Sequence, residues 1–144
     1  MTSERWKDNW RVISPPGAVR VDLPRLHAKR LELLQLIHHL PMGTPVVLFA
    51  SGPGAFRRCR SFAKEAGIAL EREYLAFPST TKPAYVVEDA RPLVRLFVKN
   101  IMAAPARTSR SMPIDAAVGL LRALHPLRLI RAAAPGRVAV GRLT

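Results

Sequence analysis

The feature that most constrains this chain is a short connection between two segments of strand character. Ile68–Phe77 and Ala84–Glu88 contain the apolar, aromatic and β-branched residues that favour strands, and only Pro78–Pro83 (PSTTKP) separates them. A parallel crossover takes about a dozen residues or more. The two strands are therefore expected to form an antiparallel hairpin, or else to belong to different sheets.

A strand and a helix precede this pair. Pro45–Ala50 (PVVLFA) is a continuous apolar run of strand length, which is typical of a strand covered on both faces. Ser51–Gly54 (SGPG) turns the chain into a helix predicted over Ala55–Ala66, and Gly67 is a natural stop for that helix. A strand–helix–hairpin block over residues 45–89 indicates an α/β fold.

The N-terminal part is expected to be an extension over residues 1–21 and then a helix. Arg11–Val21 is predicted to be extended, with Asp22 as the N-cap of a helix that reaches about Leu40.

The C-terminal part is expected to be mainly helical. A helix capped by Asp89 is predicted to run to about Ala103, and a basic loop over 104–112 leads to a helical segment over 114–133. Arg137–Gly141 is predicted to be a short final strand. Residues 22–141 then form a single α/β domain, a length usual for one domain.

The composition limits the cellular compartment and the cysteine chemistry that can be expected of this chain. The hydrophobic fraction of 49% is enough for a core, and no apolar run reaches the length of a membrane span. Met1–Trp10 lacks the apolar stretch of a signal peptide, so a cytoplasmic protein is expected, with association at a membrane surface as an alternative. A single cysteine, Cys59, excludes an intrachain disulfide, and its place in an apolar helical stripe predicts a buried, inert thiol.

The net charge of +13 favours anionic partners: a phosphorylated ligand, an acidic protein or nucleic acid. Arginine supplies most of this excess, a composition that a GC-rich genome also produces, so the charge by itself does not select a function. Homo- or hetero-oligomers are compatible with these data.

The candidate ligand site is the strand-to-helix turn. A helix N-terminus presents unpaired N–H groups to an anion, and arginines in the first turn add donors for phosphate or carboxylate. The alternative is a tight turn with solvated arginines. The residues of this candidate site are Ser51, Gly52, Gly54, Arg57 and Arg58.

A second candidate is a partner or membrane surface on the C-terminal helical segment. Arg122, Arg128 and Arg131 flank a leucine-rich stripe, which gives a basic amphipathic character. The alternative is that this segment packs on the sheet with its arginines in water.

Other polar residues give weaker indications of chemistry. Glu71 and Glu73 are expected to share one face of a strand. The favoured interpretation is that this face is exposed to solvent, and the alternative is that the two carboxylates act as a catalytic pair. His38 and His39 are adjacent on a helix and point about 100° apart, so no metal site is predicted. Catalytic residues stay unknown.

The order helix, LPMGTPVVLFAS, helix, AGIALEREYLAF, PAYVVED resembles the second half of a class I S-adenosylmethionine-dependent methyltransferase. The resemblance implies a small Rossmann-like three-layer sheet with an antiparallel terminal hairpin. It covers about Leu23–Asp89. The family's cofactor-binding half is not recognisable before Asp22, so the resemblance implies a truncated or divergent member and assigns no catalytic or cofactor residue.

The resemblance implies a methyltransferase-like domain of a bacterial biosynthetic pathway, divergent or accessory, with S-adenosylmethionine as a conceivable cofactor. The alternatives are a basic binding module and a peripheral membrane protein. A further alternative takes SGPG as a nucleotide-binding turn with Glu71 or Glu73 as the ribose-binding acid. Arg57 stands where that motif has its third glycine.

Overall fold

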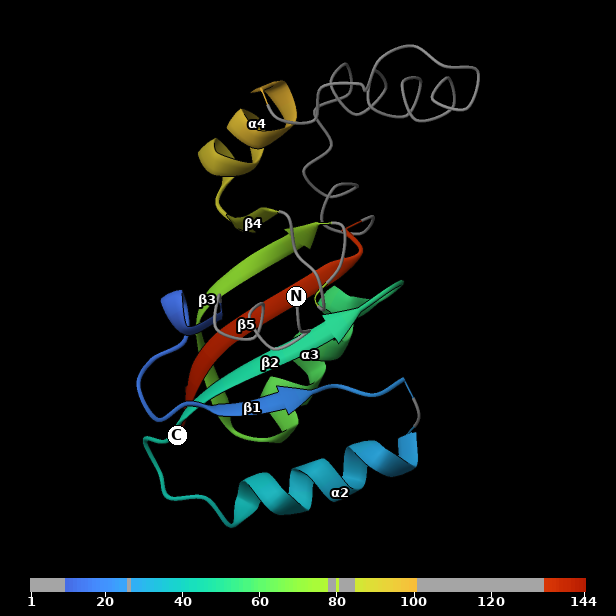
Figure 1. Cartoon of the computed structure of the whole chain (residues 1–144). Helices are drawn as coiled ribbons and strands as arrows, with labels where there is room; N and C mark the ends of the chain where they lie inside the picture. The colour runs from blue at the N-terminus through green and yellow to red at the C-terminus, as the bar shows by residue number, and fades with distance from the viewer. Residues whose placement is uncertain (1–9, 26, 78–79, 81–84, 101–133) are drawn as a thin grey trace, which may run out of the picture.

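The structure is a computed structural model that describes residues 10–25, 27–77, 80, 85–100 and 134–144. Its described elements form one five-stranded mixed sheet with the strand order β1-β2-β5-β3-β4 (Figure 1). In chain order they are η1 (Trp10–Val12), β1 (Val19–Asp22), α2 (His27–His38), β2 (Pro45–Ser51), α3 (Ala55–Glu65), β3 (Ile68–Phe77), β4 (Tyr85–Glu88), α4 (Arg91–Asn100) and β5 (Gly136–Leu143).

The central block of the sequence folds as predicted. β2 is buried from Val46 to Ala50, and α3 buries Cys59 and Phe62 against it. Gly67 follows α3 with φ 67°, a left-handed conformation that glycine adopts without strain. β3 pairs antiparallel with β4, from Tyr74 opposite Glu88 to Phe77 opposite Tyr85. The short connection therefore does join an antiparallel pair.

The last strand of the described chain occupies the middle of the sheet. β5 lies between β2 and β3 and is antiparallel to both. Its small residues allow this close packing, because a Cβ at Gly141 would overlap the main-chain oxygen of Ala69. The sequence predicted a short strand here, but not its central position.

Asp22 does not cap a helix, which corrects the prediction. It is the last residue of β1, a strand parallel to β2, and α2 begins at His27. Pairing of VRVD with β2 buries Val21, and this burial outweighs the local capping preference of the aspartate. The carboxylate of Asp22 instead accepts two hydrogen bonds from Arg20.

The two faces of the sheet are covered differently. The face that we call the helix face packs against α2 and α3, through a core that includes Ile37, Leu48, Phe62 and Ala139. Strand alternation places Leu75 on this face as well, where it contacts α4 in a smaller cluster, with the other members Val87, Val94, Phe97, Phe77 and Ala134.

The opposite face, which we call the outer face, carries residues 10–18. Trp10 packs there on Phe49 and on the neighbouring strand residues Val47, Tyr74, Ala76, Val138 and Val140. Among the described elements no α-helix lies on the outer face, where the short 3-10 helix η1 contributes Trp10, so these elements form two layers rather than the predicted three. The predicted basic loop (104–112) and the helical segment (114–133) lie outside the described residues.

In the described part of the chain, no helix is long and apolar enough to cross a membrane.

Candidate functional site

The predicted anion site is a glycine turn at the carboxyl end of β2. Gly52 and Gly54 both have positive φ angles, 72° and 75°, and Gly54 is the N-cap of α3 without a side-chain cap. Among the described residues, the backbone N–H groups of Gly54, Phe56 and Arg57 meet no backbone acceptor. The turn therefore offers the unpaired donors of a helix N-terminus.

The arginines of this turn have different roles. Arg58 folds back on the turn: its Nη1 donates to the carbonyl of Pro53 at 2.6 Å and its Nη2 donates to the carbonyl of Ser51. Arg57 is exposed, and the guanidinium of Arg25 lies against Gly52, where a Cβ would overlap it. The structure thus brings the predicted residues together, but Arg58 stabilises the turn.

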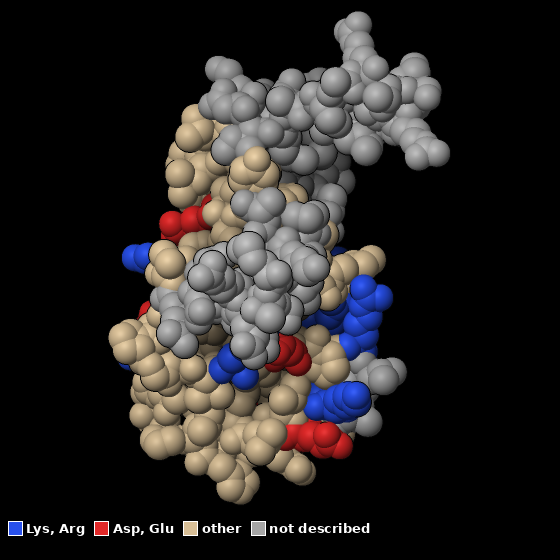
Figure 2. Space-filling view, in the orientation of Figure 1, with Lys and Arg blue, Asp and Glu red and all other residues tan. Residues whose placement is uncertain are grey.

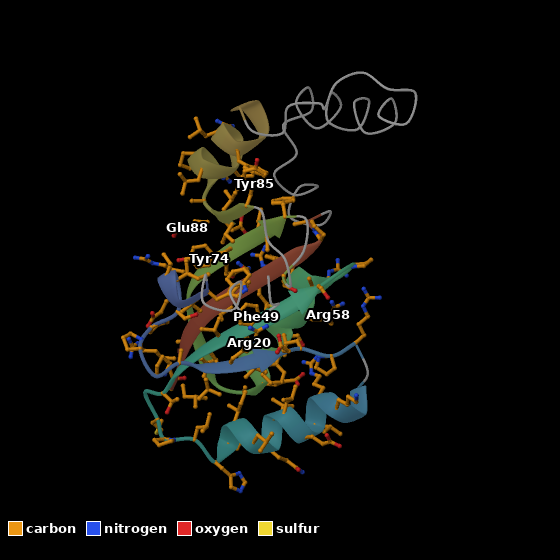
Figure 3. All side chains as sticks on the ribbon, viewed as in Figure 1. Arg20, Phe49, Arg58, Tyr74, Tyr85 and Glu88 are labelled. Atoms are coloured by element: carbon orange, nitrogen blue, oxygen red, sulfur yellow. The ribbon has the colours of Figure 1, made fainter. Side chains whose placement is uncertain are left out.

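Basic side chains gather on this side of the molecule. Figure 2 shows Lys and Arg residues at the right of the view, beside the end of β2. Figure 3 places Arg58 at the same edge. The carboxyl end of a parallel strand is where α/β sheets commonly bind ligands.

A buried charge cluster lies on the helix face, next to this turn in the sheet. Arg137 of β5 pairs with Ala50 of β2 in the register and is 1% exposed. Its Nη2 donates to Asp89 Oδ2 at 2.7 Å and to Glu73 Oε2. Glu73 also accepts from Arg60 Nε at 3.0 Å, so among the described residues two cations meet two anions here.

An aromatic ring completes the cluster. Phe56 of α3 contacts two guanidinium groups, with its centroid 4.2 Å from the Cζ of Arg137 and 4.4 Å from that of Arg60. Within the described part of the chain, Nε and Nη1 of Arg137 have no hydrogen-bond partner. The cluster joins β5, β3, α3 and the residue that follows β4.

The sequence pattern gives Arg137 no role in a site and makes Asp89 a helix cap, whereas in the structure α4 begins at Arg91 and Asp89 accepts a hydrogen bond from Arg137. The available signal was a single charged residue in the otherwise apolar run RVAV at 137–140. In a strand buried on both faces, a charge at such a position needs a buried partner.

Cys59 is the buried, inert thiol that its helical stripe predicted. It is 0% exposed, and burial raises the pKa of its thiol to about 12, an effect that the nearby Arg137 only partly opposes. At neutral pH the group is therefore a thiol, not the nucleophilic thiolate.

Glu71 and Glu73 do not share a face, which corrects the prediction. The register of β3 shifts between Leu70 and Arg72, so Glu71 is the extra residue of a β-bulge. Glu71 pairs with Arg142 on the outer face, whereas Glu73 turns to Arg137 on the helix face. A paired-carboxylate mechanism is not available to them.

A pocket of about 450 Å³ opens on the outer face between residues 10–20 and the strands. Trp10 and Phe49 form its aromatic wall, with ring centroids 5.1 Å apart and planes at 80°. The guanidinium of Arg20 lies 4.1 Å above the centroid of Phe49 (Figure 3).

The remaining sequence candidates divide into two groups. His38 and His39 are exposed at the end of α2, and the described residues contain no group of three or more potential metal ligands. Arg122, Arg128 and Arg131 lie outside the described residues.

Comparison of the chain with protein-family models, curated proteins and solved structures found no significant match.

Proposed function

We propose that this chain is a methyltransferase-like α/β domain of a bacterial biosynthetic pathway, an accessory domain that does not methylate a substrate by itself. The strand order carries the proposal. In class I methyltransferases the last strand lies between strands five and six, antiparallel to both. β5 has this position between β2 and β3.

The helices agree with the same arrangement. α2 connects β1 to β2 and α3 connects β2 to β3, and both pack on one face of the sheet. In this assignment β3 corresponds to strand six, and its partner β4 with α4 is an addition at the sheet edge. The sequence had suggested instead that β4 was the terminal strand of the hairpin.

The family's cofactor does not fit the described residues. The strands that cradle S-adenosylmethionine would pair with the side of β1 that faces away from β2, and among the described strands β1 has β2 as its one neighbour. No step of methyl transfer is therefore assigned to this chain. The proposal places cofactor binding on another polypeptide segment or on a partner.

Isothermal titration calorimetry tests this proposal. S-Adenosylmethionine is titrated into the chain by itself, and then into an equimolar mixture with a methyltransferase-like protein encoded beside it. We expect no heat of binding from the chain up to millimolar cofactor, and tighter cofactor binding by the mixture than by the neighbouring protein. Saturable binding to the chain by itself, or no effect in the mixture, would contradict the accessory role.

A second candidate is a binding module for an anionic ligand at the turn after β2. The specific observation is that unpaired N–H groups of α3, exposed Arg57 and the guanidinium of Arg25 surround one turn. Binding of pyrophosphate, followed by calorimetry, tests it.

The two neighbouring arginines form a matched pair for this test. Arg57→Ala should weaken pyrophosphate binding about tenfold without lowering the melting temperature, since its side chain is exposed. Arg58→Ala should lower stability by about 1–2 kcal/mol, because two turn carbonyls lose their donor. Equal affinity in wild type and Arg57→Ala would exclude this site.

A further inference from the structure

An exposed apolar surface lies on α4 and β4, at the end of the molecule opposite α2 (Figure 1). Leu93 and Leu96 of α4 are 42% and 57% exposed, and because they are three residues apart they are neighbours on the helix. Tyr85 of β4 is 49% exposed and extends this surface, since its ring contacts that of Phe97 with centroids 5.5 Å apart (Figure 3). Apolar side chains that gather in this way mark an interaction surface.

The other side of α4 already has its packing partner. Val94 and Phe97 are buried against Leu75 of the sheet. This contact accounts for the apolar residues on one side of the helix, and it leaves Leu93 and Leu96 in contact with water. α4 therefore carries more apolar surface than the described fold covers.

Basic side chains border the exposed leucines. Arg91 and Arg95 are exposed and four residues apart, and among the described residues neither has a carboxylate partner. α4 contains no acidic residue, and Asp89, shortly before it in the sequence, pairs with Arg137. A cation in the first turn opposes the helix dipole, so Arg91 does not serve the stability of the helix. Its place is favourable when an anion lies nearby.

We propose that this surface binds an anionic lipid bilayer, with Leu93 and Leu96 inserted beneath the headgroups and Arg91 and Arg95 at the phosphates. Exposed leucines beside cationic side chains are characteristic of helices that lie in the membrane interface. Arginine keeps its apolar stem in the bilayer while its guanidinium reaches the headgroups, and tyrosine is enriched at the same depth.

The shape of the surface favours a bilayer over a protein partner. A single helix that projects from the described elements needs a matching groove in a protein, whereas a fluid bilayer adapts to it (Figure 1). The inference does not rest on the proposed accessory role. It also concerns another part of the chain than the basic segment of Arg122, Arg128 and Arg131.

Co-sedimentation of the whole chain with lipid vesicles tests the proposal. The probes are vesicles of phosphatidylcholine with and without phosphatidylserine. We expect binding to the mixed vesicles, and about tenfold weaker binding to phosphatidylcholine by itself. Added salt should weaken binding to the mixed vesicles, because it screens the attraction between arginine and phosphate.

Two double variants separate the apolar and the charged contributions. Leu93→Gln/Leu96→Gln should lower the affinity for mixed vesicles about tenfold, because the apolar area no longer inserts. Arg91→Gln/Arg95→Gln should lower it by a similar factor and leave binding to phosphatidylcholine unchanged. Leu36→Gln, at a 66% exposed position of α2, is the matched control and should have no effect. All these side chains are exposed, so the melting temperature should stay the same.

Tryptophan fluorescence locates the inserted residues. After subtraction of the wild-type spectrum, the emission of Leu96→Trp should shift to the blue when mixed vesicles are added, and that of Leu36→Trp should not.

Absence of co-sedimentation, or an unshifted emission of Leu96→Trp, would overturn the proposal. Equal binding by wild type and Leu93→Gln/Leu96→Gln would also overturn it, by placing the contact elsewhere in the chain. Equal affinity for the two kinds of vesicle would overturn the selection of anionic lipid.

Discussion

Arg137 is the largest fully buried side chain of the described residues. One of its nitrogens donates to carboxylates from two parts of the chain, Glu73 within β3 and Asp89 after β4. The two ion pairs of Arg137 form only when β3, β5 and the residue after β4 are in place. Arg137 therefore contributes to the correct arrangement of the strands more than to the hydrophobic stabilisation of the sheet.

Removal of Arg137 should be strongly destabilising. Arg137→Met leaves the carboxylates of Glu73 and Asp89 without their buried cation, and we expect a loss of about 3–5 kcal/mol in the free energy of unfolding. Urea denaturation followed by circular dichroism measures it.

Neutralising the partners as well should restore most of that loss. The triple variant Arg137→Met/Glu73→Gln/Asp89→Asn also removes the two carboxylate charges that Arg137 paired, and it keeps similar side-chain volumes. A triple variant as unstable as Arg137→Met would show that the arginine acts through packing instead of through its charge.

Cys59 should make stability depend on alkaline pH. Its thiol pKa is about 12 in the folded protein against an ordinary 9.0. Between these values the unfolded chain loses the proton and the folded chain keeps it. The free energy of unfolding should therefore fall as pH rises, by up to about 1.4 kcal/mol per pH unit.

Comparison with Cys59→Ala isolates this contribution from other groups that titrate in the same range. Urea denaturation of both proteins from about pH 8 to about pH 10.5 should show a steeper decline in the wild type. Parallel pH profiles for the two proteins would mean that the folded-state thiol ionises normally.

At the level of elements, the sequence predicted the parts whose signals are local. The apolar run of β2, the glycines that bound α3 and the short connection after β3 each determine nearby structure. The candidate residues Ser51, Gly52, Gly54, Arg57 and Arg58 lie together around the turn between β2 and α3, because they are near neighbours in the chain. Anion binding at this turn stays a prediction.

The features that sequence analysis missed depend on distant partners. The bulge at Glu71 appears only when β3 pairs with β5, and the role of Arg137 requires Glu73 and Asp89. The sequence pattern makes Asp22 a helix cap because no local signal shows that Val19–Asp22 pairs with β2 as a parallel strand. Long-range pairing overrides local preference at each of these places.

Gly141 provides a test of the close packing of β5. A Cβ at this position would overlap backbone atoms of Ala69, and backbone cannot move aside as a flexible side chain can. Gly141→Ala should therefore lower the free energy of unfolding by about 3 kcal/mol. Thermal denaturation provides the measurement.

Gly43→Ala is the matched control. Gly43 has φ 81° and open space around it, so the alanine meets backbone strain only, about 1 kcal/mol. Equal costs at the two positions would show that the strand contact at Gly141 can relax.

At the scale of the whole molecule, the sheet has a protected centre and exposed sides. β5 has strand neighbours on both sides, whereas β1 and β4 are each paired on one side among the described strands. β5 has buried residues on both the helix face and the outer face of the sheet. Local opening is therefore expected to begin at β1 and β4.

Amide hydrogen exchange measured by mass spectrometry tests this order. Amides of Val138–Val140 should exchange most slowly, and those of Val19–Asp22 and Tyr85–Glu88 at least tenfold faster. β2 and β3 should be intermediate. Equal protection of β1 and β5 would indicate that the edge of β1 that faces away from β2 is covered.

The central position of β5 also has a consequence for biosynthesis. A ribosome makes β5 after every other described element, so β2 and β3 emerge without the strand that joins them. Until Gly136–Leu143 leaves the ribosome, the nascent chain carries two apolar strands with unpaired edges. We expect this protein to fold only after translation of that segment, and to depend on chaperones that hold nascent chains until then.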